Sequence, residues 1–420
     1  MSIYTDVQFI GYAIPSIPRL LADIVDPPSF VEGHYTGIEP AIEDVGERIV
    51  LTMRAIEQTA RSGAVDASES TLKIFVMPEF SFRGRRGAYN NDPPEVDYFT
   101  LFRKEFARRV AVPAYRNWLF VVGTIVNTVN YVRGNDPRQD LKVRVREGLA
   151  VALARAWHYC AEHEDPALKK CVFNTLRCFT DYCHDDPVCQ VTDKSYVVAG
   201  GREPDDTYPN GLSIEKKYIS NEDFVLNFYR SAFAEEACGY PPISEKDGEN
   251  KDSAFDVFSI FTIQGIKFGL EICLDHMNGR LRINRKPRNE QVQIQLIPSC
   301  GGQIEQAAVV AGPGGLVFNC DGQYDQSQLG AQPDTSNSIW TGADSQLAHT
   351  QLAQVETPCG DDPGNISRAT LTRPEATTVT KVVIDDRLAS RLFAYGAGEV
   401  HIYTSLSVPP ATPDSPPDAG

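Results

Sequence analysis

The stretch LKIFVMPEF, residues 72–80, decides the fold class that the sequence predicts. It is a continuous apolar run of strand length that ends in Pro78-Glu79. A strand buried on both faces has this pattern, whereas a strand of a one-sided sheet alternates apolar and polar residues. The runs WLFVVGTIV (118–126) and VQIQLIPS (292–299) have the same character. We therefore expect a central sheet whose strands are covered on both faces.

Helical patterns alternate with these runs. In residues 42–60, apolar side chains recur at the spacing of an amphipathic helix, and residues 98–115 predict a second helix. The runs 255–263 and 266–273 flank Gln264-Gly265, which predicts a hairpin because glycine adopts the positive φ of a tight turn. Together these elements indicate an α/β or layered α+β fold.

Most of the chain is expected to form one domain, residues 1–407. Residues 133–170 open with a polar turn and continue as a helix, and we interpret them as an insertion followed by a loop-rich segment at 180–210. Residues 408–420 form a Pro-rich tail with little to bury and are expected to be disordered.

Composition limits the classes of partner. The formal net charge of the 420 residues is −16, which disfavours nucleic acids and anionic membrane surfaces. No apolar stretch reaches the ~20 residues of a spanning helix, and the N-terminus lacks the pattern of a signal peptide. The sequence thus predicts a cytoplasmic protein that acts on a small molecule.

Three strand ends each carry a chemically useful side chain: Glu79, Lys217 in LSIEKKYIS (212–220), and Cys273 in IKFGLEIC. Ligands commonly bind near strand ends in such folds. A thiolate can attack a carbonyl or nitrile carbon. A carboxylate can take the thiol proton and return it to the leaving nitrogen, and an ammonium can stabilise the developing negative charge.

These segments resemble the nitrilase superfamily. The resemblance is carried by Pro78-Glu79-Phe80, by the lysine of KKYIS, and by GLEICLD (269–275) followed by Pro298-Ser299. Weaker matches are Gly123-Thr124 and Asn174-Thr175. Matching segments run from the first strand to about residue 320.

The resemblance implies an α+β fold, an αββα sandwich that dimerises into a four-layer stack, so a homodimer or higher homo-oligomer is expected. It implies Glu79 as general base, Cys273 as nucleophile, and Lys217 with the Leu274 N–H as oxyanion stabilisers. No metal or organic cofactor is implied. Members of the family often carry a second active-site glutamate between the lysine and the cysteine. Here Glu222, Glu235 and Glu236 are the candidates.

Several assignments stay open at the level of sequence. Lys216 competes with Lys217, which is preferred because KYIS fits the family's lysine-first turn. Asp275 is expected to support the loop after the nucleophile. His276 is a candidate substrate contact or a loop histidine, and Glu271 a site carboxylate or, preferentially, a salt-bridge partner.

Two further clusters have competing interpretations. Five cysteines lie between Cys160 and Cys189 with three histidines nearby, but their spacing lacks the close pairs of a zinc site. Free thiols are favoured over structural zinc or a Cys183–Cys189 disulfide. The basic run Arg83–Arg86 follows Glu79 and is a solvated loop or a carboxylate-recognition element.

The predicted function is hydrolysis of a small amide, carbamoyl compound or nitrile through a cysteine thioester. Two alternatives use the same fold. One is an amide-forming or acyl-transfer enzyme that passes the acyl group to an acceptor other than water. The other is a catalytically retired scaffold, which the intact set of glutamate, lysine and cysteine argues against.

Overall fold

The computed structural model describes most of the strands and helices that the sequence predicts. The described residues are 3–17, 19–20, 33–85, 87–90, 97–130, 189–202, 211–218, 259–285, 291–323, 349–359, 368–375 and 377–411. The expected insertion at 133–170, Asn174-Thr175 and the cysteines from Cys160 to Cys183 lie outside them, as do most of the loop at 180–210 and residues 412–420 of the tail.

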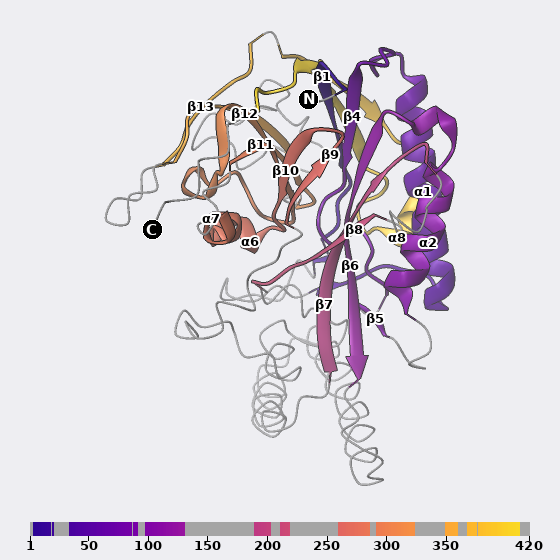
Figure 1. Ribbon diagram of the computed structural model, residues 1–420. Helices are drawn as coiled ribbons and strands as arrows, with labels where there is room; N and C mark the ends of the chain where they lie inside the picture. Colours follow the sequence, from indigo (N-terminus) through magenta and orange to yellow (C-terminus); the bar gives the residue numbers. More distant parts are fainter. Residues whose placement is uncertain are drawn as a thin grey trace, which may run out of the picture.

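The first sheet is built around parallel strands from the N-terminal part of the chain (Figure 1). In the described part its order is β15-β16-β1-β4-β6-β7-β8, with β17 on β1 and β5 on β6. The central β1, β4 and β6 are parallel, and β7 and β8 continue antiparallel. The bounds are β1 Asp6–Ala13, β4 Thr71–Val76, β5 Tyr89–Asn90, β6 Trp118–Asn130, β7 Cys189–Ala199, β8 Leu212–Glu215, β15 Val379–Val383, β16 Glu399–Tyr403 and β17 Leu406–Ser407.

The second sheet contains the cysteine-bearing segment. Its order in the described residues is β14-β13-β12-β11-β10-β9, and β10, β11 and β12 are parallel. A short pair, β2 Arg19–Leu20 and β3 Gly33–His34, lies apart from both sheets. The bounds are β9 Ile260–Ile263, β10 Ile266–Leu270, β11 Val292–Ser299, β12 Ala311–Asp321, β13 Thr350–Thr357 and β14 Thr370–Thr372.

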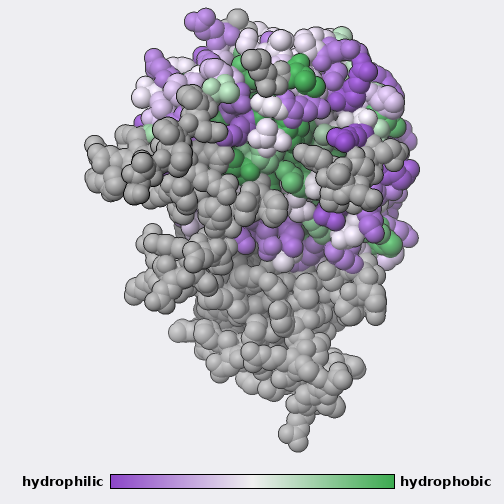
Figure 2. Space-filling model, in the orientation of Figure 1, coloured by the Kyte–Doolittle hydropathy of each residue, from purple (hydrophilic) through white to green (hydrophobic). Residues whose placement is uncertain are grey.

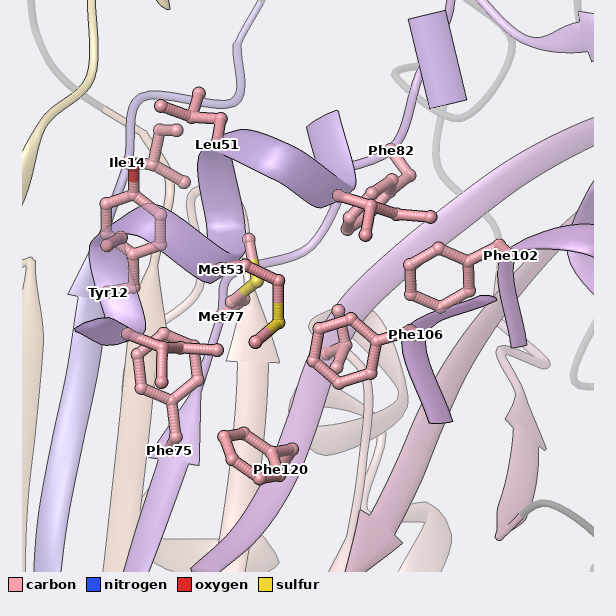
Figure 3. Close-up of a cluster of buried hydrophobic side chains, with 14 of the residues drawn as sticks. Tyr12, Ile14, Leu51, Met53, Phe75, Met77, Phe82, Phe102, Phe106 and Phe120 are labelled. Atoms are coloured by element: carbon pink, nitrogen blue, oxygen red, sulfur yellow. The ribbon is translucent and has the colours of Figure 1, made fainter. Parts of the chain in front are cut away.

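Helices cover the face of the first sheet that points away from the second (Figure 1). They are α1 Ala41–Arg61, α2 Tyr98–Val110 and the short α8 Ala389–Leu392. Asp97 caps α2 by accepting from the Phe99 and Thr100 N–H groups, which would otherwise lack partners in the first turn. Figure 3 shows the resulting core, in which Met53 and Phe106 of the helices lie near Phe75 and Phe120 of the sheet.

The two sheets pack face to face through a second apolar core. Its side chains come from β1, β4 and β6 on one side and from β9 to β13 on the other. Phe9 stacks on Phe318 with ring centroids 5.0 Å apart, which joins β1 to β12. The outer face of the second sheet carries a third cluster with Leu281 of α7 Arg280–Arg285. The molecule is thus a mixed α+β structure with two sheets and few helices.

Several predicted elements are confirmed and others are corrected. The hairpin of β9 and β10 forms at Gln264 and Gly265, both with positive φ, as a tight two-residue turn requires. The helix expected over 98–115 ends at Val110, and a 3-10 turn, η1 Pro113–Tyr115, begins with the proline that interrupts it. The strand expected over 212–220 ends at Glu215. Strand β7 was not predicted and corrects part of the loop expected at 180–210, and strands β13 to β15 were not predicted either.

Hydrophilic residues make up most of the described surface in the view of Figure 2. The exposed large apolar side chains of the described residues are single positions such as Ile3, Ile42 and Val383. No described helix combines the length and apolar character that crossing a membrane requires. Residues 408–411 of the predicted tail are described, and Val408 donates to the Thr5 carbonyl.

Candidate active site

Glu79 lies in the loop that follows β4, and backbone contacts from three segments fix its position. Its N–H donates to the Ser299 carbonyl at the end of β11, 3.3 Å away. Ser16, just after β1, donates from Oγ to the Glu79 carbonyl at 2.5 Å. The next N–H, of Phe80, donates to Thr124 Oγ1 at 2.8 Å. The Glu79 side chain is fully buried between the sheets' ends.

The loop around Glu79 is also held from the helical layer. Arg48 of α1 donates to the Ser81 carbonyl at 3.1 Å and forms a buried ion pair with Asp44 at 2.7 Å. Gly123 of β6 lies so close to the loop that a Cβ there would collide with the Pro78 carbonyl oxygen. The glycine in the Gly123-Thr124 pair is therefore required by the close approach of two backbones.

Lys216, rather than Lys217, contacts Glu79. The Lys216 Nζ lies 2.6 Å from Glu79 Oε1, and both side chains are fully buried. The preference for Lys217 is corrected: β8 ends at Glu215, and Lys217 is the partly exposed residue of the pair. A buried ammonium is stable here because the carboxylate compensates its charge. The geometry therefore supports Lys216, the alternative to Lys217, as the lysine of the site.

Asp275 determines which lysine enters the site. Its Oδ1 accepts from the backbone N–H groups of Lys217 at 2.9 Å and Tyr218 at 2.8 Å. Its Oδ2 pairs with Arg280 at 2.6 Å, and the same guanidinium nitrogen donates to the Glu215 carbonyl at 2.7 Å. Asp275 accepts from backbone N–H groups as expected, but these belong to the turn after β8, so the expectation that it supports the loop after the nucleophile is corrected.

Cys273 lies at a sharp turn between β10 and the short helix α6 Leu274–Met277. Its φ is 45° and its N–H donates to the Pro298 carbonyl at 3.0 Å. The residue is buried, with 8% of its surface exposed, and Sγ lies 3.7 Å from the Cys300 carbonyl oxygen. Leu274 follows directly, and its N–H, the first of α6, has no acceptor among the described residues. This amide is available to a ligand at the sulfur.

The electrostatic environment couples the thiol to the other two groups. Burial raises the pKa of the Cys273 thiol well above its usual value, and the Glu79 carboxylate, which also interacts with the thiol by a hydrogen bond, raises it further. Lys216 and a backbone hydrogen bond with Cys300 act in the opposite direction on this pKa. The thiol is therefore protonated at neutral pH, with a carboxylate beside it that can accept the proton.

Backbone strain is concentrated at Cys273 and at Phe80, the residue after Glu79. Phe80, directly after Glu79, has φ 62°, and Cys273 has φ 45°. In the described part of the chain the other non-glycine residue with positive φ is Gln264, in the hairpin turn. Such conformations cost roughly 1–3 kcal/mol each and are common at functional sites.

His276 does not point its ring nitrogens at a ligand, which corrects its assignment as a substrate contact. Its Nε2 accepts from the Glu305 N–H at 2.9 Å, so this nitrogen is unprotonated. Nδ1 then donates to Glu271 Oε2 at 2.7 Å. Leu281 N–H and Gln295 also donate to the Glu271 carboxylate, so Glu271 is a structural hydrogen-bond acceptor, which replaces the preferred interpretation as a salt-bridge partner.

The remaining candidates differ in position. Glu222, Glu235 and Glu236 lie outside the described residues. In the basic run after Glu79, Arg85 is exposed, but Arg83 is fully buried between the rings of Tyr35 and Phe80, at 4.3 and 4.6 Å from the centroids. The solvated-loop interpretation is therefore wrong for Arg83.

No group of three His, Cys, Asp or Glu side chains within the described ranges could hold a metal ion. Four cysteines in these ranges, 273, 300, 320 and 359, are buried free thiols. Ser16, which donates to the Glu79 carbonyl, could not be found from sequence, because a serine near a strand end is common in any fold.

Comparison with protein-family models finds no match, and neither does comparison with curated protein sequences. Among solved structures, the chain is similar to an amidase from Nesterenkonia sp. AN1. A glutamate-to-glutamine mutant of that amidase, with the acetamide moiety of fluoroacetamide added covalently at its active-site cysteine, shares 9% identity over 76% of each chain, with TM-score 0.30. Its cysteine-to-alanine mutant in complex with butyramide shares 10% over 76% of each, with TM-score 0.28. The functional interpretation therefore depends on the site itself.

Proposed function

We propose that this chain is a carbon–nitrogen hydrolase that cleaves a small non-peptide amide, carbamoyl compound or nitrile through a thioester on Cys273. The observation that carries the proposal is the buried contact of Glu79 with Lys216 at 2.6 Å, beside a thiol whose protonation both groups influence. A carboxylate, an ammonium and a thiol have no structural reason to share an apolar interior, because burying charge is costly.

The acylation step assigns one role to each group. As the Cys273 sulfur attacks the carbonyl carbon, Glu79 takes the thiol proton, so a thiol of raised pKa can still react. Lys216 and the Leu274 N–H stabilise the negative charge that develops on the substrate oxygen. Glu79 then gives the proton to the nitrogen, and ammonia or an amine leaves as the C–N bond breaks.

Deacylation uses the same groups in a second round. Water attacks the thioester carbon while Glu79 accepts a proton from it, and the C–S bond breaks. The proton returns to sulfur, which restores the Cys273 thiol and releases the carboxylic acid. Each step balances without a redox partner or a metal ion.

The backbone conformation supports this assignment independently of charge. Cys273 and Phe80 both adopt positive φ, so the segments that present the nucleophile and the base are strained. The surrounding hydrogen bonds to Pro298 and Thr124 hold these conformations in place. Strain that the surroundings enforce at two neighbouring segments is typical of a catalytic site.

The test is a screen of small amides and nitriles for ammonia release, followed by intact-mass analysis of wild type quenched in acid during turnover of the best substrate. We expect an acyl adduct on Cys273, and none in Glu79→Gln, which lacks the base for acylation. The Cys273→Ala variant should be folded and inactive. The Cys300→Ala variant is the matched control and should keep activity. An adduct on Cys300, or full activity of Cys273→Ala, would reject the proposal.

A further inference from the structure

A carboxylate outside the catalytic set, Asp321, lies next to it at the end of β12. The strand register pairs Asp321 with Ser299. The Ser299 carbonyl accepts from both the Glu79 N–H, at 3.3 Å, and the Gly322 N–H, at 3.0 Å. Gly322 in turn lies so close to Ser16 that a side chain there would collide with the serine Oγ. Asp321 is thus part of the same packed strand ends that position the base.

One peptide unit connects Asp321 to the nucleophile. The carbonyl oxygen of the Cys300–Gly301 peptide lies 3.7 Å from Cys273 Sγ. The N–H of the same peptide donates to Asp321 Oδ1 at 2.7 Å. A single peptide group therefore lies between Cys273 Sγ and Asp321 Oδ1, with Sγ close to its carbonyl oxygen and Oδ1 bonded to its N–H. A substrate whose carbonyl carbon lies at Cys273 can therefore reach Asp321 with a chain only a few bonds long.

Backbone N–H groups hold the Asp321 carboxylate. Oδ1 also accepts from the Gln323 N–H at 3.1 Å, so the side chain is fixed. Both of these hydrogen bonds reach Oδ1, a further backbone contact to the carboxyl comes from Gly322, and the residue is partly exposed. Burial raises the pKa of Asp321 to about 7, and the negative charge of Glu79 contributes to this rise. The two carboxylates therefore repel each other, and among the described residues the Lys216 ammonium is paired to Glu79.

Starting from the proposed function, we propose that Asp321 selects substrates that carry a cationic group a few bonds from the scissile carbonyl. An ammonium next to Oδ2 would gain an ion pair with Asp321 and would also offset the repulsion between Asp321 and Glu79. The substrate class is thus an ω-amino amide or a related cationic carbamoyl compound. An anionic group at the same place would be repelled by both carboxylates.

The test compares 4-aminobutanamide with pentanamide, in which a methyl group replaces the ammonium. At about pH 8 the Asp321 carboxyl is largely ionised. We expect wild-type kcat/KM to favour the cationic amide by roughly tenfold to a hundredfold, and this ratio to fall to near one in Asp321→Asn. The asparagine keeps the Oδ1 acceptor for Gly301 and Gln323 and removes the charge. Pentanamide hydrolysis by the variant is measured alongside, so that a general loss of activity enters both terms of the ratio and cancels.

Glu105→Gln on α2 is the matched control, since it removes one negative charge beside Arg108 and Arg109, away from the site. It should leave the ratio at its wild-type value. Calorimetric binding of both amides to Cys273→Ala, with and without Asp321→Asn, measures the preference without turnover. If wild type hydrolyses neither amide and the wider screen finds no substrate, the proposed function fails, while the binding still decides on Asp321. An equal binding of both amides, or a ratio that Asp321→Asn leaves intact, overturns the assignment.

Discussion

The carboxylate of Asp275 holds the backbone of Lys217, with Oδ1 2.9 Å from the Lys217 nitrogen. This hydrogen bond ties the turn after β8 to the helix that follows the nucleophile. Because the Lys217 backbone faces Asp275, the preceding side chain, that of Lys216, extends to Glu79. Asp275, two residues after the nucleophile, thus helps to place the Lys216 ammonium that serves Cys273.

The two neighbouring lysines are expected to differ strongly in their effect on turnover. Lys216→Met should lower kcat/KM by about a hundredfold to a thousandfold, the usual loss when an oxyanion donor is removed. Lys217→Met is the matched control and should stay near wild type, because its side chain is partly exposed and its backbone contact persists. Steady-state kinetics of both variants decides this. A larger loss for Lys217→Met would restore the original preference.

Replacing the general base should change the acidity of the nucleophile in a defined direction. The Glu79 charge raises the pKa of Cys273 and Lys216 lowers it. In Glu79→Gln the first effect is lost and the second remains, so the pKa of the thiol should fall while turnover is abolished. The pH dependence of iodoacetamide alkylation at Cys273, with Cys273→Ala as blank, measures this. An upward shift or an unchanged profile would contradict the proposed contact between carboxylate and thiol.

Asp275→Ala should destabilise the fold as well as the site. The variant leaves the buried Arg280 guanidinium without its carboxylate, and breaking such a pair costs about 3–5 kcal/mol. Urea unfolding at neutral pH measures the loss. Asp275→Asn keeps an oxygen acceptor for the Lys217 and Tyr218 N–H groups. Its kcat should therefore fall less than that of Asp275→Ala. Equal effects of the two variants on kcat would show that the backbone hydrogen bonds do not position Lys216.

His349 and His401 should make the free energy of unfolding fall in mild acid. Burial, with His401 adding its charge, lowers the pKa of His349 from 6.5 to about 4. Between these values the unfolded chain binds more protons than the folded chain, so stability is complete above about pH 6.5 and declines as pH falls toward 4. The difference between the two pKa values of His349 corresponds to about 3 kcal/mol of stability.

Urea unfolding at several pH values, compared between wild type and His349→Gln, isolates this contribution. The variant has no titratable group at 349 and should show a shallower decline of the free energy of unfolding. His401, whose pKa burial also lowers, contributes to the decline that persists in the variant. Identical pH profiles would mean that His349 does not titrate differently in the folded and unfolded chains.

The continuous apolar strands and the two long helices could be predicted because their signals are local, whereas β7 and β13 to β15 could not. The apolar run of β4 and the helical spacing of α1 each lie within one segment, and the structure confirms both. The choice between Lys216 and Lys217 could not be made in this way. It depends on where β8 ends and on a contact with Asp275, 58 residues further along the chain.

The same reason explains the error at His276. Its neighbours in sequence give no sign that its two ring nitrogens bond Glu271 and the Glu305 backbone. Asp321 was missed because a single aspartate after a strand has no motif. Its importance appears only when Ser299 and Glu79 are brought beside it.

The left-handed conformation at position 273 has a consequence for any attempt to make this protein more heat-resistant. Glycine adopts φ 45° without a steric penalty, so Cys273→Gly would relieve a local conformational cost that cysteine bears. A selection for thermal survival alone would therefore tolerate loss of the sulfur. Retention of cysteine at this turn requires continued demand for its chemistry.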